Sequence, residues 1–453
     1  MRTATGSWLW RTMERKSNKL LITRWNGQIL TALTEDGKCR SLNLEPADSR
    51  GILGNIYIGK VKNIVKNINS AFVDLGSGQI GYYSLKENKR HLFTDEIAAA
   101  QAGNRKKTEG EENGTEEGWM KKSDGFPVRA KERLPKAGDE IIVQVERDAV
   151  KTKDPVLTSN LNFTGKYLVL TLGKNQIGFS GKIRDGAWKE SLKKILEEKK
   201  DDSFGIIVRT NAREADIQSI LRELELLKER KSRLFATAGW RTCYSLLSTS
   251  EPSYVNSIRD TYAENLEAIV TDDRDCYDAL RTYMEENQRE DLEKLSFYED
   301  TMVPLAKLYS LDTAMEQALG KHVWLKSGGY LVIEPTEALT VIDVNTGKYA
   351  GKKTQAETIL RINREAAVEI ARQMQLRNLS GIIIVDFIDM DADEDKKELM
   401  RLLELELLRD PVKTVLVEMT KLGLVEITRK KIRRPLAEQV RELRSRQQLK
   451  EKN

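Results

Sequence analysis

Residues 337–353, EALTVIDVNTGKYAGKK, run as an apolar strand and then end in polar residues. Asp343 and Asn345 are two positions apart, so in a strand their side chains point to the same face. Asp, Asn and Gly are also ordinary turn residues, and from this segment alone a turn is an equal alternative. A feature elsewhere in the chain has to decide between the two.

Residues 381–390, GIIIVDFIDM, supply a second apolar strand that ends in Asp386, with Asp389 three residues later. A lone Asp at a strand end is usually a helix cap or a turn residue, but neighbouring strands would bring Asp386 to Asp343 and Asn345. Two carboxylates and an amide suit Mg²⁺, which takes few protein ligands and keeps waters for a phosphate substrate. The pattern predicts a magnesium site at two strand ends.

The segment around these strands predicts an α/β layer. Further strands are expected at 329–335 and 413–420, with helices around 355–376 and 394–408. The first helix keeps one apolar face, formed by Ile359, Ile362, Ala366, Ile370 and Met374.

The N-terminal half is rich in β-strand patterns. Residues 19–42 predict a hairpin with its turn at Asn26-Gly27, and 54–87 with 138–161 predict a small five-stranded barrel. The interruption, 94–135, is rich in Gly, Glu, Lys and Asn and has no hydrophobic period, so a disordered inserted loop is expected. Strands follow within 161–209, and then a helix for which Asn211 and Glu214 resemble a capping box.

Composition limits the class of protein. The chain has 453 residues, of which 40% are hydrophobic, enough for two to four ordinary domains. The net charge is only +5 although 32% of residues are charged, so binding to nucleic acid must come from local patches. Only two histidines are present, which argues against a paired-histidine nuclease and leaves metal-assisted chemistry open.

The cysteines and the apolar segments of the sequence indicate the cellular compartment of the protein. Three scattered cysteines show neither disulfide nor metal spacing, which suits a reducing environment. The N-terminus has too short an apolar stretch for a signal peptide, and no segment approaches about 20 apolar residues. A cytoplasmic protein without a membrane segment is expected.

The segments TEALTVIDVNTGK, GIIIVDFIDM and KLGLVEITRKKIR resemble, in order and spacing, the catalytic core of the ribonuclease E/G family. The resemblance covers about Lys19 to Pro435, because NIYIGKVKNIVKNINSAFVDLGSGQIGYYSLKE resembles the RNA-binding barrel of that family, and GKYLVL with GIIVRT resembles its 5′-sensor. It implies a multi-domain α/β protein, α+β overall, in which an OB-fold barrel and a sensor region are inserted in an RNase H-like subdomain and followed by a DNase I-like α/β domain. The implied boundaries are 18–52 and 255–317 for the RNase H-like subdomain, and 53–160 for the OB fold with the disordered insertion 94–135. The sensor is expected at 161–254 and the DNase I-like catalytic domain at 318–435. Residues 436–453 are expected to be a basic tail, and the alternative for this segment is a solvated helix.

The resemblance also implies site residues. Asp343, Asn345 and Asp386 fall on the positions of the metal site, with Asp343 and Asp386 catalytic, whereas Asp389 matches the motif without a ligand role and is expected to be structural. Phe72, Tyr82 and Lys153 fall on RNA-binding positions; the alternatives are barrel core for the aromatic residues and a solvated lysine. Arg209 and Thr210 match residues that hold a 5′-monophosphate, and Gly165 and Val169 match the floor of that site; an arginine on a surface strand end is the alternative. A helix N-terminus beside Arg209 is expected to help.

The chain departs from the family after Arg434, where the usual Cys-Pro-x-Cys of a shared zinc site is missing. Zinc is therefore not expected, any homo-oligomer is expected to form without a zinc link, and the shorter, ribonuclease G-like branch is the closer match. The implied activity is Mg²⁺-dependent (or Mn²⁺-dependent) endonucleolytic cleavage of single-stranded RNA to 5′-phosphate and 3′-hydroxyl ends, stimulated by a 5′-monophosphate, in ribosomal RNA processing and messenger RNA decay. The alternative is a non-catalytic RNA-binding or ribosome-assembly factor.

Overall fold

The computed structural model describes residues 18–47, 51–88, 90–108, 133–148, 154–261, 266–300, 302–347 and 355–451. The chain divides into two compact units, Met1–Ser49 with Ser253–Asn453 and Arg50–Pro252. The second unit is one continuous segment, and the first is built from the segments on both sides of it.

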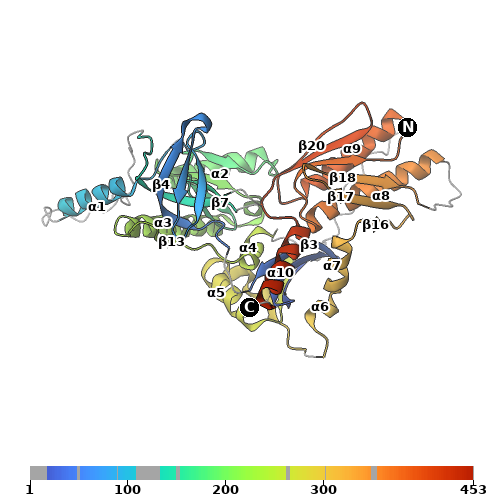
Figure 1. Ribbon diagram of the computed structural model, residues 1–453, viewed down its shortest axis with the longest axis horizontal. Helices are drawn as coiled ribbons and strands as arrows, with labels where there is room; N and C mark the ends of the chain where they lie inside the picture. The colour runs from blue at the N-terminus through green and yellow to red at the C-terminus, as the bar shows by residue number, and fades with distance from the viewer. Residues whose placement is uncertain are drawn as a thin grey trace. The chain divides into compact units, whose positions relative to one another are not determined.

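A six-stranded sheet carries the two strand ends predicted to bind metal (Figure 1). Its strands, in sheet order, are β16 (His322–Trp324), β17 (Tyr330–Pro335), β18 (Leu339–Asn345), β19 (Gly381–Asp386), β21 (Leu424–Arg429) and β20 (Thr414–Met419). Helices α8 (Gln355–Leu376) and α9 (Asp393–Leu408) lie side by side and share an apolar core with one face of this sheet. The predicted strands and helices are confirmed, whereas β16 and β21 were not predicted.

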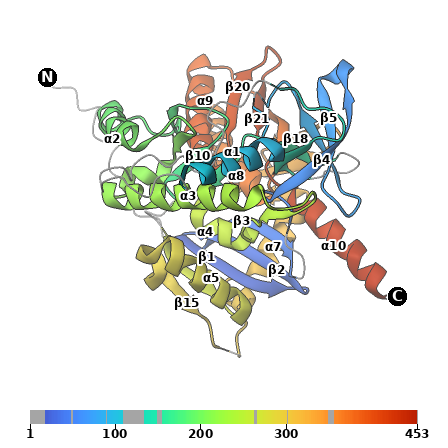
Figure 2. The same ribbon diagram turned by 90° about the vertical axis from the view of Figure 1, so that its left-hand side faces the viewer.

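A second, five-stranded sheet contains three strands from the first 46 residues and two strands from the middle of the chain (Figure 2). In order it contains β15 (Leu295–Phe297), β14 (Leu266–Thr271), β1 (Asn18–Trp25), β2 (Gln28–Glu35) and β3 (Lys38–Pro46). The predicted hairpin is confirmed: Asn26 and Gly27 have φ of 48° and 74°, as a two-residue turn with both φ positive requires. Helices α4 (Ser253–Asp260), α5 (Arg274–Asn287), α6 (Leu305–Leu308) and α7 (Leu311–Leu319) belong to the same unit.

The C-terminal segment forms a helix, α10 (Leu436–Glu451), that packs on β3 and α7. Leu436, Val440 and Leu443 are buried in the core of the five-stranded sheet, and Gln439 Oε1 accepts a hydrogen bond from Leu44 N at 2.8 Å. The alternative of a helix is therefore confirmed, but the first half of α10 is packed against the protein and not solvated. The spacing of these three residues, four and then three, is that of one helical face.

A closed five-stranded barrel lies in the unit Arg50–Pro252, as predicted. Its strands pair in the order β4 (Ile56–Val65), β5 (Ser70–Asp74), β6 (Ile80–Ser84), β8 (Val156–Thr158) and β7 (Glu140–Arg147), and β7 returns to β4. The short β13 (Leu246–Ser248) adds to β4. A Cβ on Gly81 would lie 2.4 Å from Leu157 Cδ1, so glycine allows β6 and β8 to approach.

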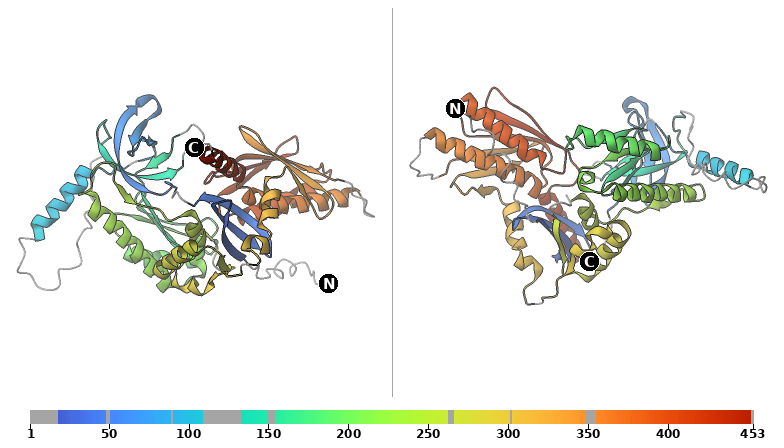
Figure 3. Two further views of the ribbon diagram at one scale, coloured as in Figure 1. Left: turned by 60° about the horizontal axis from the view of Figure 1, so that its bottom comes forward. Right: turned by 180° about the vertical axis from the view of Figure 1, so that it is seen from behind.

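The insertion in the barrel begins with a helix, α1 (Thr94–Thr108), which extends away from the barrel (Figure 3). The disordered loop expected from residue 94 is therefore wrong for these residues, and 109–132 lie outside the described part of the chain. Ile97 is fully buried, and Gln101 donates from Nε2 to Phe235 O at 2.5 Å. The helix escaped prediction because Ile97 is the one fully buried side chain between Thr94 and Gln101, too few for a visible period.

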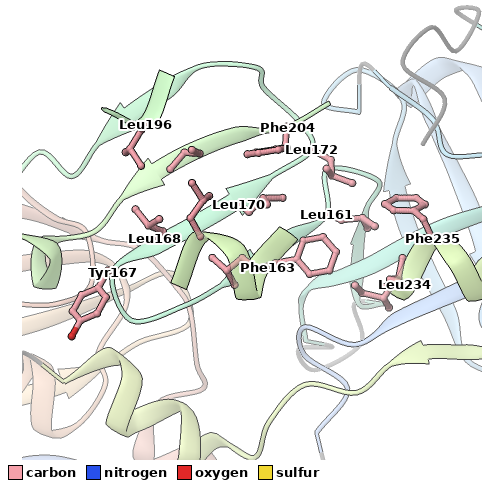
Figure 4. Close-up of a cluster of buried hydrophobic side chains, with 14 of the residues drawn as sticks. Leu161, Phe163, Tyr167, Leu168, Leu170, Leu172, Leu196, Phe204, Leu234 and Phe235 are labelled. Carbon is pink, nitrogen blue, oxygen red and sulfur yellow. The ribbon is translucent and has the colours of Figure 1, made fainter. Parts of the chain in front are cut away.

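The rest of this unit is a four-stranded sheet with two helices. In order the strands are β11 (Ile177–Phe179), β12 (Gly205–Val208), β10 (Leu168–Thr171) and β9 (Asn162–Thr164), and the helices are α2 (Gly186–Lys199) and α3 (Ile217–Ala238). Leucine and phenylalanine side chains of these elements form one buried cluster (Figure 4). The expected capping box is wrong: Asn211 and Glu214 lie in a 3₁₀ helix (Thr210–Glu214), and Asp216 caps α3 by accepting from Ser219 N at 2.9 Å.

No helix in the part of the chain that the structure describes has the length and apolar composition needed to cross a membrane.

Candidate functional site

Asp343 on β18 is directly paired with Asp386 on the parallel strand β19. Ile342 and Val344 point into the core between sheet and helices, so Asp343 and Asn345 point to the opposite face. Asn345 Nδ2 donates a hydrogen bond to Asp343 Oδ2 at 2.8 Å. The structure thus brings the three predicted residues together on one face of the sheet.

The turn alternative fails for these residues because Asp343 and Asn345 are both part of β18. Beyond the strand, Gly347 has a positive φ of 62°. A Cβ there would lie 2.2 Å from Gly328 O, so a side chain has no room at this position. Gly347 is therefore explained by its positive φ and its close approach to Gly328, and this does not explain the polar residues at the end of β18.

The two carboxylates repel each other. The pKa of Asp386 is raised, first by partial burial and then by the negative charges of Asp343 and Asp389. No lysine or arginine among the described residues forms an ion pair with Asp343 or Asp386. A bound cation would relieve this repulsion.

The donor set fits Mg²⁺. The site at the ends of β18 and β19 offers two carboxylates, Asp343 and Asp386, and the amide of Asn345. Within the described ranges no group of three or more His, Cys, Asp or Glu side chains is placed so that it could hold a metal ion. Mg²⁺ accepts such a small set because it keeps several waters. Asp389 is exposed in the loop beyond β19, where its Oδ1 lies 3.8 Å from the position of a Cβ on Gly423.

Sequence reasoning missed Asn363, which fixes the loop that follows Asp386. This α8 side chain is fully buried, donates from Nδ2 to Ile388 O at 2.8 Å and accepts from Ile388 N at 3.1 Å. It pairs with the loop as a backbone peptide would. The signal in the sequence was an amide side chain within the apolar face of the helix, between Ile362 and Ala366.

On the barrel, Phe72 and Tyr82 are directly paired across β5 and β6. Their ring centroids are 6.2 Å apart with the planes at 77°, and both side chains are half-buried. The barrel core takes their neighbours Ala71, Val73 and Tyr83, so the core alternative does not hold for the aromatic pair. Lys153 lies outside the described residues.

At the expected sensor, Arg209 follows β12 and reaches the turn between β9 and β10. Its Nη1 donates to Gly165 O at 2.6 Å, and its backbone N donates to Tyr167 O at 2.8 Å. Val169 is half-buried on β10, directly paired with Ile207 of β12. The structure therefore joins Gly165, Val169 and Arg209 in one small region.

Thr210, next to Arg209, shares a hydrogen bond with Ser180, Oγ1 to Oγ at 3.0 Å. A helix N-terminus does lie at Arg209, which is the N-cap residue of the short 3₁₀ helix Thr210–Glu214, whereas the longer helix α3 begins only at Ile217. Ser180 and Glu223, which contacts the Gly165 turn, are further residues of this region that sequence reasoning missed.

Comparison with known proteins confirms the resemblance seen in the sequence. The sequence profile of the Ribonuclease E/G family matches residues 162–432. Ribonuclease G of Haemophilus influenzae is 33% identical over 420 residues, covering 92% of this chain and 80% of that protein. Ribonuclease G of Escherichia coli K12 is 33% identical over 422 residues with the same coverage, and ribonuclease E of Nostoc is 30% identical over 422 residues, 91% of this chain and 56% of that protein. The chain therefore belongs to the ribonuclease E/G family.

Proposed function

We propose that the chain is an Mg²⁺-dependent endoribonuclease that cleaves single-stranded RNA. The observation that carries this proposal is the direct pairing of Asp343 with Asp386, beside an amide and without a basic partner in the described residues. Its relatives bear the names ribonuclease G and ribonuclease E, which supports the reaction class.

Asp343 and Asp386 would hold the ion, and Asn345 would keep the Asp343 carboxylate oriented through its 2.8 Å hydrogen bond. Bound Mg²⁺ supplies a more acidic water and neutralises charge on the phosphate. Attack by water on phosphorus would form a new P–O bond and break the bond to the 3′-oxygen, which leaves as the 3′-hydroxyl after taking up a proton. The ribose 2′-hydroxyl is not used, so the products would be a 5′-phosphate and a 3′-hydroxyl. Asn363 would keep the loop after Asp386 in place.

RNA binding would use the barrel and the sensor. Phe72 and Tyr82 present half-exposed rings on which bases stack without sequence preference. Lys153 would contact the RNA backbone. Arg209 and Thr210 would bind a 5′-monophosphate beside Gly165 and Val169, because a guanidinium offers a terminal phosphate paired, charge-assisted hydrogen bonds.

We propose the biological role that the resemblance to the ribonuclease E/G family implies: processing of ribosomal RNA and decay of messenger RNA in the cytoplasm. The missing cysteines after Arg434 lead us to propose an enzyme that binds no zinc.

The test is to incubate purified protein with 5′-monophosphorylated single-stranded RNA, with Mg²⁺ and with a chelator. Cleavage is expected only with Mg²⁺, while binding of the RNA survives chelation. RNA that is bound but stays uncut at every Mg²⁺ or Mn²⁺ concentration would instead identify a non-catalytic RNA-binding factor.

A further inference from the structure

Glu223 is a buried carboxylate in the middle of α3, only 8% exposed. Three backbone N–H groups at the turn between β9 and β10 donate to it: Lys166 N to Oε2 at 2.8 Å, Tyr167 N to Oε1 at 2.9 Å and to Oε2 at 3.2 Å, and Leu168 N to Oε1 at 2.7 Å. Tyr167 and Leu168 lie at one end of the apolar cluster (Figure 4). One side chain thus fixes three consecutive peptides.

Arg209 holds the same turn through its carbonyl groups. Gly165 O accepts from Arg209 Nη1 at 2.6 Å, and Tyr167 O accepts from Arg209 N at 2.8 Å. The N–H groups of the turn therefore face Glu223, and two of its carbonyl groups face Arg209. The carboxylate also interacts electrostatically with the Arg209 guanidinium.

Gly165 fits between these two side chains because it has none of its own. A Cβ at this position would lie 2.2 Å from Glu223 Oε1 and 2.4 Å from Glu223 Cδ. Any larger residue has to displace the carboxylate from its three donors or move the turn. The position of the Gly165 carbonyl, and with it the direction of the Arg209 side chain, therefore depends on Glu223.

Holding a turn in place with a buried carboxylate costs free energy, because the charged group is removed from water. Burial raises the pKa of Glu223, and the three N–H groups lower it by stabilising the charged form. An apolar side chain would have filled this space in α3 without that cost. The carboxylate does what an apolar side chain cannot: it fixes the orientation of peptides that in turn hold an arginine.

We propose that Glu223 is a positioning residue that orients Arg209, through the 165–168 turn, for binding the 5′-terminal phosphate of RNA. This inference rests on the proposed function of Arg209 as a phosphate ligand. Glu223 itself touches no RNA.

The experiment compares single-turnover cleavage of two RNAs that differ only in a 5′-monophosphate or a 5′-hydroxyl, and records their binding in parallel. Glu223→Gln keeps the shape but puts an NH₂ group where an N–H donor needs an acceptor. It should lower the ratio of the two cleavage rates about three- to ten-fold, within the loss of about ten- to a hundred-fold expected for Arg209→Ala. Cleavage of the 5′-hydroxyl RNA should stay near the wild-type rate, which excludes a folding defect.

Two further variants sharpen the test. Gly165→Ala should reproduce the Glu223→Gln effect, and Glu223→Gln combined with Arg209→Ala should be no worse than Arg209→Ala alone, since both act through one group. Glu225→Gln is the matched control: this residue lies two positions along α3, is exposed and pairs with Lys228, so both rates should be unchanged.

Equal slowing of both RNAs by Glu223→Gln would overturn the inference and leave a structural role. The inference would also be overturned if Arg209→Ala lost the preference for 5′-monophosphorylated RNA while Glu223→Gln kept the wild-type ratio of the two cleavage rates. In that case Arg209 would still be the phosphate ligand. A wild-type enzyme that treats both RNAs alike would overturn the sensor itself and this inference with it.

Discussion

Asp343 and Asp386 occupy directly paired positions on two parallel strands, with both carboxylates on the face of the sheet that helices α8 and α9 leave uncovered. Parallel neighbours lie about 4.8 Å apart, so the two charges stay close whatever their rotamers. The strand pair therefore builds an acidic site from residues 43 positions apart in the sequence.

Asn363→Ala should weaken Mg²⁺ binding without touching a metal ligand. The change removes both hydrogen bonds to Ile388 and leaves an N–H and a carbonyl of the loop without partners, which costs about 1–3 kcal/mol. Cleavage at limiting Mg²⁺ should fall about ten-fold and recover at high Mg²⁺. A titration of rate against Mg²⁺ measures this. Arg364→Ala, the exposed neighbour that pairs with Glu398, is the control, and an Mg²⁺ requirement equal to that of the control would show that Asn363 does not position the loop.

Leu436→Ala should destabilise the protein, because α10 is docked through this residue. A fully buried leucine lost from a core costs about 2–5 kcal/mol. Arg444→Ala, on the exposed side of the same helix, should change stability by no more than about 0.5 kcal/mol. Urea denaturation followed by circular dichroism compares the two, and equal midpoints would show that α10 is not held by its apolar face.

Zinc should be absent. The sequence has no cysteine after Arg434, and the residues that follow form α10, which packs into the core of the five-stranded sheet. Activity should survive a zinc-selective chelator, and any dimer must use protein surfaces that bury about 1,200 Å² or more. Metal analysis of the purified protein decides; one zinc per two chains would contradict the prediction.

The parts of the fold that the sequence predicted are those with a local pattern. The Asn26-Gly27 turn, the barrel strands and the strand ending in Asp343 each show a period or a turn signal within a few residues. The place of β21 between β19 and β20 was not visible, because sheet order depends on tertiary pairing that no local pattern encodes.

Polar residues with a tertiary role were also missed. Glu223 stands between Ile220 and Leu227 on the buried face of α3, and Asn363 stands between Ile362 and Ala366 on the buried face of α8. Each is a polar residue that interrupts an apolar helix face, and its role becomes clear only when the loop to which it is hydrogen-bonded is known. The candidate metal ligands were easier to single out, because carboxylate and amide groups at the ends of apolar strands stand out in the sequence.

The most direct test of the metal site is single-turnover cleavage by Asp343→Asn and Asp386→Asn beside a binding titration on the same RNA. Each change keeps the shape and removes one negative charge, so cleavage should fall at least about a hundred-fold, partly recover at high Mg²⁺ or Mn²⁺, and leave RNA binding intact. Asn345→Ala should be milder, since an uncharged group is lost, and Asp389→Asn milder still, since this exposed residue lies outside the paired positions. Wild-type cleavage by either paired Asp→Asn variant would contradict the account.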